Sequence, residues 1–268
     1  MEKKVSILNS RSLIKISGKD SLLFLNNIIS SNLEKINNKE MLPTVLLSPQ
    51  GKILFDFFIL KNEDYYLIEC SKNQLNDLMN KLKLYSLRLI VTFEKINLDI
   101  IVSNYFYKDE ITRKDVRFKN NDIYRHFANP KKNYKNLCLK DWYDQLRFLN
   151  LCPEGELEIP ANKLFPFEVD TIFNHGVDFD KGCFIGQEVI ARVKYKGSVK
   201  KKYISFRINS SKTIDNENIN DINKKLVGSL IYNAEIYNDI FGFGLLKIEN
   251  NQKQLEFFCK GFRLDILN

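Results

Sequence analysis

The period of the apolar residues over the first hundred positions is the feature that most restricts the fold. Residues 11–17, RSLIKIS, alternate apolar and polar side chains as a strand does, and Gly18 breaks the pattern. The apolar period then lengthens to that of a helix. The residues on the expected helical face are Leu22, Leu25, Ile29 and Leu33. A helix next to strands in the chain predicts an α+β unit.

Three apolar runs separated by polar turns continue this unit. The runs TVLLS, KILFDFFIL and YYLIEC predict a three-stranded meander, with Gly51 in the first turn. Ser71 can cap a second helix that ends near Tyr85, and residues 87–96 return as a strand. The order β-α-β-β-β-α-β predicts split βαβ (ferredoxin-like) elements, with helices on one side of a mostly antiparallel sheet.

The middle of the chain has weaker periodicity. We expect strands at residues 98–103 and 115–119 and a helix at residues 142–149. Residues 151–180 hold three of the six prolines and little periodicity. This segment therefore predicts an ordered, irregular layer over a pocket, where functional residues often lie.

The pattern changes again after Gly197. Short alternating apolar runs separated by glycines predict a small β-barrel that extends to the C-terminus. We therefore expect two domains. Residues 1–197 would form two interleaved α+β subdomains, and residues 198–268 would form the barrel.

Composition indicates a folded protein without a membrane segment. Of the 268 residues, 44% are hydrophobic and 12% aromatic, and no apolar run approaches the roughly 20 residues that span a bilayer. The opening MEKKVSILNSRSLIKISG reaches strand-like alternation at once, so we expect no signal or transit segment and a cytoplasmic location. The net charge of +8 permits a nucleic acid or another polyanion, such as a polyglutamylated cofactor, as a partner.

One stretch, KGCFIGQEVIAR at residues 181–192, has the residue types of a reactive site. Five cysteines and two histidines without a C-x-x-C pair spell out neither a disulfide framework nor a closed zinc site. Cys183 stands out because its neighbours are mostly glycine, polar or charged residues. If Gly186 opens a helix, the helix N-terminus and Lys181 would stabilise a thiolate at Cys183. The apolar residues also suit a strand, and the sequence does not decide.

These residues also have a plain structural interpretation. A free cysteine is usually a small core residue. Glu188 and Arg192 could form only a solvated ion pair worth about 0.2–0.5 kcal/mol. The lysines that follow could meet anionic groups or form a solvated basic face. They are Lys194, Lys196, Lys200, Lys201 and Lys202.

The stretch KGCFIGQEVIAR resembles the signature of the YgfZ family, folate-binding relatives of the glycine-cleavage aminomethyltransferase (GcvT). A weaker likeness runs through LIKISGKDSLLFLNNIISSNLEKI, LLSPQGKILFDFFIL, LKLYSLRLIV and LFPFEVD to LVGSLIY and GFGLLKI. The resemblance implies a GcvT/YgfZ-like α+β fold around a central folate pocket, with a small C-terminal barrel. It also implies a role in assembling or repairing iron–sulfur clusters in a subset of enzymes, including tRNA-modifying ones.

The resemblance further implies roles for individual residues. Cys183 is the expected catalytic residue, with Lys181 beside it, and Glu168 falls where aminomethyltransferases have a glutamate that grips the pterin ring. A carboxylate suits that role because it accepts two adjacent N–H donors. The implied cofactor is tetrahydrofolate or a one-carbon derivative. The residues assigned to bind it are Glu168, Gly182, Gly186, Gln187, Glu188, Arg192 and Trp142.

Two departures from the family bear on the reaction. Where aminomethyltransferases carry paired acids in a strand, this chain has Phe55 beside Asp56, and the missing acid puts aminomethyl transfer in doubt. A tryptophan that one branch associates with folate is replaced by Arg11 and Ser12. Trp142 could stack on a ligand or anchor a buried helix.

Three functions stay open on the sequence. The first is a tetrahydrofolate-binding protein that supports iron–sulfur client enzymes through a reactive Cys183 beside the folate pocket, with an indirect link to tRNA modification. The second is a folate-dependent aminomethyl- or methyltransferase, and the third is a non-catalytic tRNA-associated module. The sequence does not decide whether the chain is an enzyme.

Overall fold

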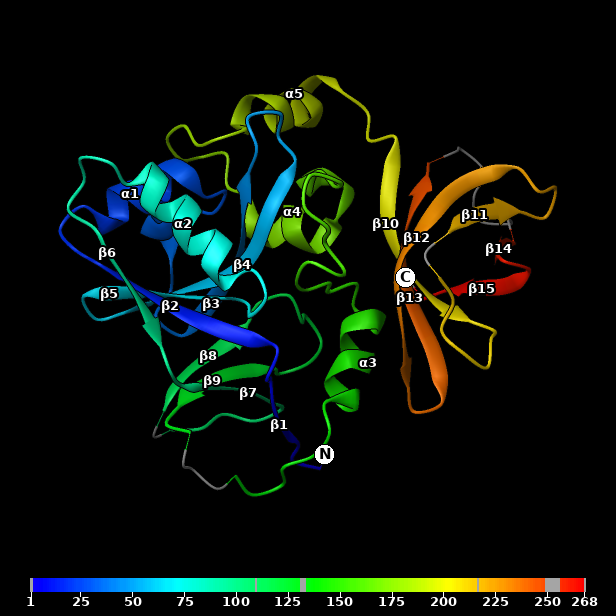
Figure 1. Cartoon of the computed structure of the whole chain (residues 1–268), viewed down its shortest axis with the longest axis horizontal. Coiled ribbons are helices and arrows are strands. Elements are labelled where there is room, and N and C mark those ends of the chain that lie inside the picture. The colour runs from blue at the N-terminus through cyan, green and yellow to red at the C-terminus, as the bar shows by residue number, and fades with distance from the viewer. Residues whose placement is uncertain (1, 109, 131–133, 216, 249–255, 268) are drawn as a thin grey trace.

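An α+β body and a β-barrel make up the molecule, and helix α3 (Asp141–Leu149) lies between them (Figure 1). The computed structural model describes residues 2–108, 110–130, 134–215, 217–248 and 256–267. Every helix in these ranges is too short or too polar to span a bilayer. The α+β class predicted from the sequence is confirmed.

Nine strands form the sheet of the body. In chain order they are β1 (Val5–Ile7), β2 (Arg11–Ser17), β3 (Glu40–Leu47), β4 (Ile53–Asn62), β5 (Tyr65–Ser71), β6 (Thr92–Ile96), β7 (Asp99–Ser103), β8 (Ile111–Asp115) and β9 (Tyr124–Ala128). They lie in the order β1-β7-β9-β8-β3-β4-β5-β2-β6. Neighbouring strands pair antiparallel except β3 and β8, which pair parallel. The meander of β3, β4 and β5 is as predicted.

Helices α1 (Ser21–Ile28) and α2 (Leu75–Tyr85) cover one face of this sheet. Phe24 of α1 and Leu78 of α2 belong to the same buried cluster as Phe57 of β4. The adjacent residue of β4 belongs to a different cluster, on the opposite face, because successive side chains of a strand point to opposite sides. The sheet is therefore buried on both faces around β4.

The second helix begins later than predicted. Gln74 is its N-cap residue, while Ser71 is the last residue of β5 and pairs with Arg11 of β2. The prediction that Ser71 caps the helix is therefore wrong. The reason is that the strand ladder holds Ser71 in an extended conformation.

One further prediction for the middle of the chain is wrong, and another is met only in part. The strand predicted at residues 115–119 lies earlier, at β8 (Ile111–Asp115), and residues 116–119 leave it in a turn, where Oδ1 of Asp115 accepts a hydrogen bond from the Arg117 N–H at 3.1 Å. Residues 151–180 are less irregular than expected. The regular elements there are η2 (Pro166–Glu168) and α4 (Asp170–Gly176).

Six strands close into the C-terminal barrel. They are β10 (Lys201–Ile208), β11 (Asn218–Asp221), β12 (Leu226–Ile236), β13 (Asp239–Lys247), β14 (Phe257–Cys259) and β15 (Phe262–Ile266), in the order β10-β13-β12-β11-β14-β15. Residues 216, 249–255 and 268 of the predicted barrel lie outside the described residues. The exact division into residues 1–197 and 198–268 stays a proposal.

Helix α3 joins the barrel to the body through aromatic side chains. Phe148 of α3 stacks on Phe243 of β13, with ring centroids 4.3 Å apart. On the side of the body, Trp142 and Tyr143 are buried in the cluster that includes Phe58 of β4. The segments that follow α3 are thereby held where body and barrel meet.

Candidate functional site

A network of buried charged side chains lies where the sheet meets the loop after α3. Arg125 is fully buried and donates hydrogen bonds to Glu69 and Glu154, each at 2.5 Å. Arg117 donates to Glu154 at 2.5 Å and to Asp115 at 2.7 Å. Burial works to raise the pKa of Glu154, but Arg125 and Arg117 hold it well below its usual range. Glu154 is therefore ionised although it is buried.

A second buried pair fixes the other end of the same loop. Arg147 of α3 donates to both carboxylate oxygens of Glu158, at 2.6 and 2.9 Å. The hydroxyl of Tyr203, on β10, donates to the backbone carbonyl of Glu158. The N–H of Glu154 donates to the Glu158 carboxylate at 2.7 Å. The loop is thus held to both α3 and the barrel.

A cavity of about 180 Å³ lies beside these two pairs, and we call it the central cavity. The body, α3, the loop and the barrel all contribute to its wall. Among the lining residues are Arg11, Ser71, Tyr143, Gly155, Glu156 and Tyr232. Its position at the junction of the parts suits a ligand site.

Asp56 lies directly behind the wall of the central cavity. Its Oδ2 accepts a hydrogen bond from the N–H of Gly155 at 2.9 Å, and Gly155 lines the cavity. Its Oδ1 is buried and has no hydrogen-bond partner among the described residues. Burial raises the pKa of Asp56 to about 6, although Arg11 opposes the shift. A buried carboxylate with a free acceptor oxygen is costly, and such groups concentrate at functional sites.

The missing acid at Phe55 bears less on this cavity than the sequence suggested. Phe55 packs against the cluster on the helical side of β4 and lines a separate cavity of about 500 Å³ near α2. Asp56 is adjacent in the strand and lies on the other face. The acid that is missing would face away from the central cavity. Strand alternation was the signal that could have identified Asp56 from the sequence.

The KGCFIGQE stretch forms the entrance to helix α5 (Gln187–Lys196), so the helical alternative is the one observed. Gly186 is the N-cap residue, with φ of 78°. Cys183 precedes it by three residues and is exposed. In the described part of the chain, the lining of the central cavity includes no residue of this stretch. The thiol is therefore accessible from the surface but not part of the cavity wall.

Lys181 fastens this loop to the end of α1. Its Nζ donates to the backbone carbonyls of Ile29 at 2.9 Å and Ser31 at 2.6 Å. Burial lowers the pKa of Lys181 to about 8, against the opposing effect of Asp178. A cation suits this position because the carbonyls at a helix C-terminus carry partial negative charge. The structure gives Lys181 a positioning contact, and its role as a catalytic residue stays a prediction.

The other assigned residues of the stretch lie at the surface around α5. Gly182 is exposed, and Gln187 accepts a hydrogen bond from the Phe184 N–H at 3.3 Å. Glu188 and Arg192 are 3.5 Å apart, with side chains 88% and 74% exposed. Such a pair contributes little to stability. Their contacts match the plain structural interpretation, and a role in binding folate stays a prediction.

Glu168 and Trp142 have structural contacts away from the KGCFIGQE stretch. Glu168 accepts a hydrogen bond from the Phe165 N–H at 2.9 Å in η2, and burial raises its pKa. Trp142 is buried in α3 and donates its indole N–H to Ser6 at 2.8 Å. The described lining of the central cavity includes neither residue. The lining of the central cavity therefore does not join the assigned cofactor-binding residues, and their role in binding folate stays a prediction.

Replacing Gly186 by alanine is expected to lower the free energy of unfolding by about 1–3 kcal/mol. Its φ is positive, and an added Cβ would lie 2.6 Å from the backbone oxygen of Ser48. Gly182→Ala is the matched control, because a Cβ there meets nothing within 4 Å. Urea unfolding of both variants measures the difference. Equal effects would contradict a steric requirement at Gly186.

Comparison with known proteins identifies the fold. The crystal structure of glycine cleavage system aminomethyltransferase T from Bartonella henselae matches with a TM-score of 0.72 at 11% sequence identity. The match covers 98% of this chain and 84% of that one. The chain has the aminomethyltransferase fold. The predicted GcvT-like arrangement of an α+β body with a C-terminal barrel is thereby confirmed.

Sequence relatives of this chain are named as iron–sulfur cluster assembly factors. One, "Iron-sulfur cluster assembly factor IBA57 homolog, mitochondrial" from Neurospora crassa, is 26% identical over 232 residues, which cover 74% of this chain and 52% of that protein. A protein of the same name from Mycosarcoma maydis is 25% identical over 244 residues, covering 82% and 60%. The chain spans about half to three-fifths of the length of these curated relatives. No family model matches it.

These relatives bear on two predictions. They are named as iron–sulfur cluster assembly factors, which agrees with the iron–sulfur part of the resemblance, while membership of the YgfZ family itself stays a prediction. They are also named as mitochondrial, so the predicted cytoplasmic location is contradicted. Composition and strand patterns describe the folded domain, whereas targeting segments determine the compartment, and this is why that prediction failed.

Proposed function

We propose that this chain is a mitochondrial folate-binding factor that supports the assembly of iron–sulfur clusters in client enzymes. Its likeness to iron–sulfur cluster assembly factors over about three-quarters of its length supports the client class. The free, buried Oδ1 of Asp56 behind the central cavity is the observation that carries the folate part of the proposal. Enzymes that modify tRNA are among the proposed clients.

The residues at the central cavity suit the ring of a folate. The volume of about 180 Å³ is below the roughly 300–1,000 Å³ typical of sites for whole small molecules. The cavity would therefore enclose the pterin ring and leave the rest of the molecule outside. Asp56 would accept a pterin N–H at Oδ1, and the ring of Tyr232 would supply an apolar wall. Bound tetrahydrofolate would supply or accept a one-carbon unit.

Cys183 would act at the protein surface, where a client or a cluster can reach its thiol. Lys181 would fix the loop that carries it, through the carbonyls at the end of α1. This separates two tasks. Folate would bind between body and barrel, while the thiol would act outside that cavity.

We expect Cys183→Ala to abolish rescue in cells that lack the gene, measured as the activities of iron–sulfur enzymes. The side chain is exposed, so the free energy of unfolding and the affinity for tetrahydrofolate should change little. Cys138→Ala is the matched control, because Cys138 is also an exposed free cysteine. Full rescue by Cys183→Ala would exclude the thiol from the function.

Folate-dependent aminomethyl transfer is the second candidate. Asp56 favours it, because an acid is retained on the face of β4 toward the central cavity.

Calorimetric titration with tetrahydrofolate, and then with tRNA at several salt concentrations, separates a folate-binding protein from a tRNA-associated module. Folate binding without salt-sensitive tRNA binding would disfavour a tRNA-associated module. Turnover of an aminomethylated carrier in the presence of tetrahydrofolate would favour the transferase.

A further inference from the structure

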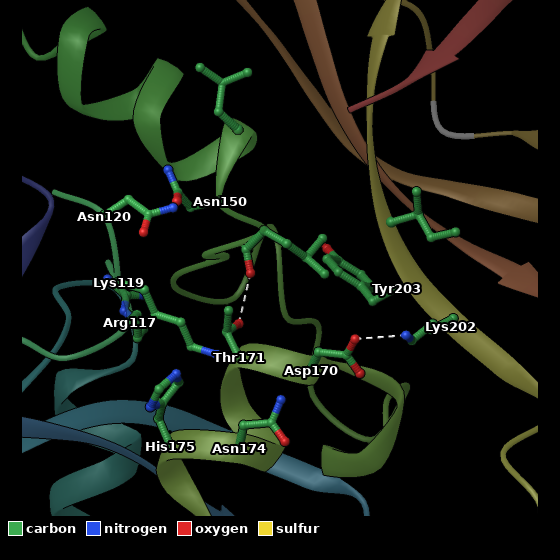
Figure 2. Close-up of a pocket in the computed structure, with 13 residues that line it drawn as sticks. Arg117, Lys119, Asn120, Asn150, Asp170, Thr171, Asn174, His175, Lys202 and Tyr203 are labelled. Atoms are coloured by element: carbon green, nitrogen blue, oxygen red, sulfur yellow. Dashed lines mark hydrogen bonds and ion pairs between the residues drawn. The ribbon is translucent and has the colours of Figure 1, made fainter. Parts of the chain in front are cut away.

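A second polar cavity, of about 370 Å³, lies on another side of the loop after α3. Figure 2 shows it between α4, the turn after β8, the end of α3 and strand β10. Among the described residues, its lining shares no member with that of the central cavity or with the KGCFIGQE stretch. We call it the α4 cavity. It is a separate site that the proposed function does not use.

The charged side chains of the α4 cavity leave a positive excess. The lining includes the cations Arg117, Lys119 and Lys202 and one acid, Asp170. Lys202 is paired with Asp170 at 2.7 Å, and Arg117 is paired within the buried network. Lys119 forms no ion pair within the described residues, and Figure 2 shows its side chain extending into the cavity. A positive group in this cavity therefore lacks a counter-charge.

The uncharged side chains around Lys119 can donate hydrogen bonds to the oxygen atoms of a ligand. His175 of α4 lines the cavity, together with the amide side chains of Asn120, Asn150 and Asn174. Burial lowers the pKa of His175, and Lys119 and Arg117 lower it further, while Asp115 opposes them. The imidazole thus lies in a region of positive potential that a bound anion would relieve.

We propose that the α4 cavity binds a small multivalent oxyanion, either a phosphate ester or a dicarboxylate, with Lys119 and His175 as its main contacts. An ammonium, an imidazole and several amide N–H groups converging on one space are the donors that oxyanions require. The site goes beyond the proposed function, since the central cavity proposed for folate and the Cys183 thiol lie elsewhere. Its volume of about 370 Å³ admits a ligand of metabolite size.

Nuclear magnetic resonance of the imidazole groups tests the site, because the chain has two histidines. His175 lines the α4 cavity, whereas His126 is fully buried between Ser103 and Thr112, at 2.6 and 2.7 Å, and serves as an internal reference. Titration with inorganic pyrophosphate and, separately, with glutarate should shift the His175 signals in a saturable manner and leave those of His126 in place. The anion that binds more tightly identifies the ligand class, because pyrophosphate represents the phosphate esters and glutarate the dicarboxylates.

Charge reversal provides the matched pair of variants. Lys119→Glu should weaken binding of the tighter anion by roughly tenfold or more, because it removes a charged donor and adds repulsion. Lys163→Glu makes the same change of charge at an exposed lysine outside the α4 cavity and should leave the affinity within about twofold. No shift of His175, or equal weakening by both variants, would overturn the proposal. Folate affinity, measured on the same samples, reports on the other cavity independently.

Discussion

Replacing Arg125 by methionine is expected to lower the free energy of unfolding by about 3–5 kcal/mol. The guanidinium is fully buried and donates to Glu69 and Glu154, each at 2.5 Å. Methionine has a similar volume but carries no charge, so two buried carboxylates lose a shared partner. The loss should exceed that of a simple cavity, because ionised groups stay behind without full compensation.

Arg207→Met is the matched control for this variant. Arg207 pairs with Asp239 at the same distance of 2.5 Å, but the two side chains are 56% and 37% exposed. Exposed pairs contribute about 0–1 kcal/mol to stability, so the free energy of unfolding of this variant should be close to that of the wild type. Urea unfolding measures both. If Arg125→Met does not fold, Arg125→Lys retains the charge and should show a smaller loss. Equal stabilities of the two methionine variants would contradict the stabilising role of the network.

The second large effect is expected at Asp56. Asp56→Asn should raise the free energy of unfolding by about 1–3 kcal/mol at pH 7.5 and weaken tetrahydrofolate binding at least roughly tenfold. The gain arises because the native protein ionises a buried carboxylate with a free Oδ1. The loss arises because an amide cannot replace a carboxylate as a charge-assisted acceptor for the pterin. A residue that costs stability and supports binding is typical of a functional site.

The raised pKa of Asp56 determines how its contribution to the free energy of unfolding depends on pH. Burial raises the pKa of Asp56 from 3.8 to about 6, so the folded state binds more protons than the unfolded state between these values. The contribution of Asp56 to stability therefore falls as pH rises through this window. The gain from Asp56→Asn should be complete above about pH 6 and absent below about pH 4.

Asp64→Asn is the control for this experiment, because Asp64 is exposed in the turn between β4 and β5. It should change the free energy of unfolding by less than about 0.5 kcal/mol at either pH. Calorimetry with tetrahydrofolate measures the affinity of both variants. A destabilised Asp56→Asn variant with unchanged affinity would remove Asp56 from the proposed folate site.

Several features of the structure could be predicted from the sequence because short-range patterns determine them. The change of apolar period at Gly18 identified the strand and helix that open the body. Alternating runs after Gly197 identified the barrel. The polar neighbours of Cys183 argued against a core position, and the structure has this thiol exposed before a helix, a choice between helix and strand that the sequence left open.

The contacts of the assigned cofactor-binding residues depend on more than local patterns. Glu168 stays a predicted pterin contact from its position in a motif, and the structure shows that its carboxylate caps the turn that contains it. Trp142 was open to either interpretation, and its indole donates to Ser6, which is 136 residues away. Contacts of this kind depend on how distant elements pack. A residue's place in a motif therefore does not determine its neighbours in space.

The sequence by itself determined the run of elements from β2 to β6, the barrel and the polar surroundings of the thiol, because each depends on neighbours along the chain. The tertiary structure alone decided where the charges are buried. Arg125 meets Glu69 from 56 residues away and Glu154 from 29, so no local period reveals these pairs. It also decided that Asp56 lies behind a cavity with a free oxygen. Burial and charge pairing are properties of the packed molecule, and the chemistry of the site depends on both.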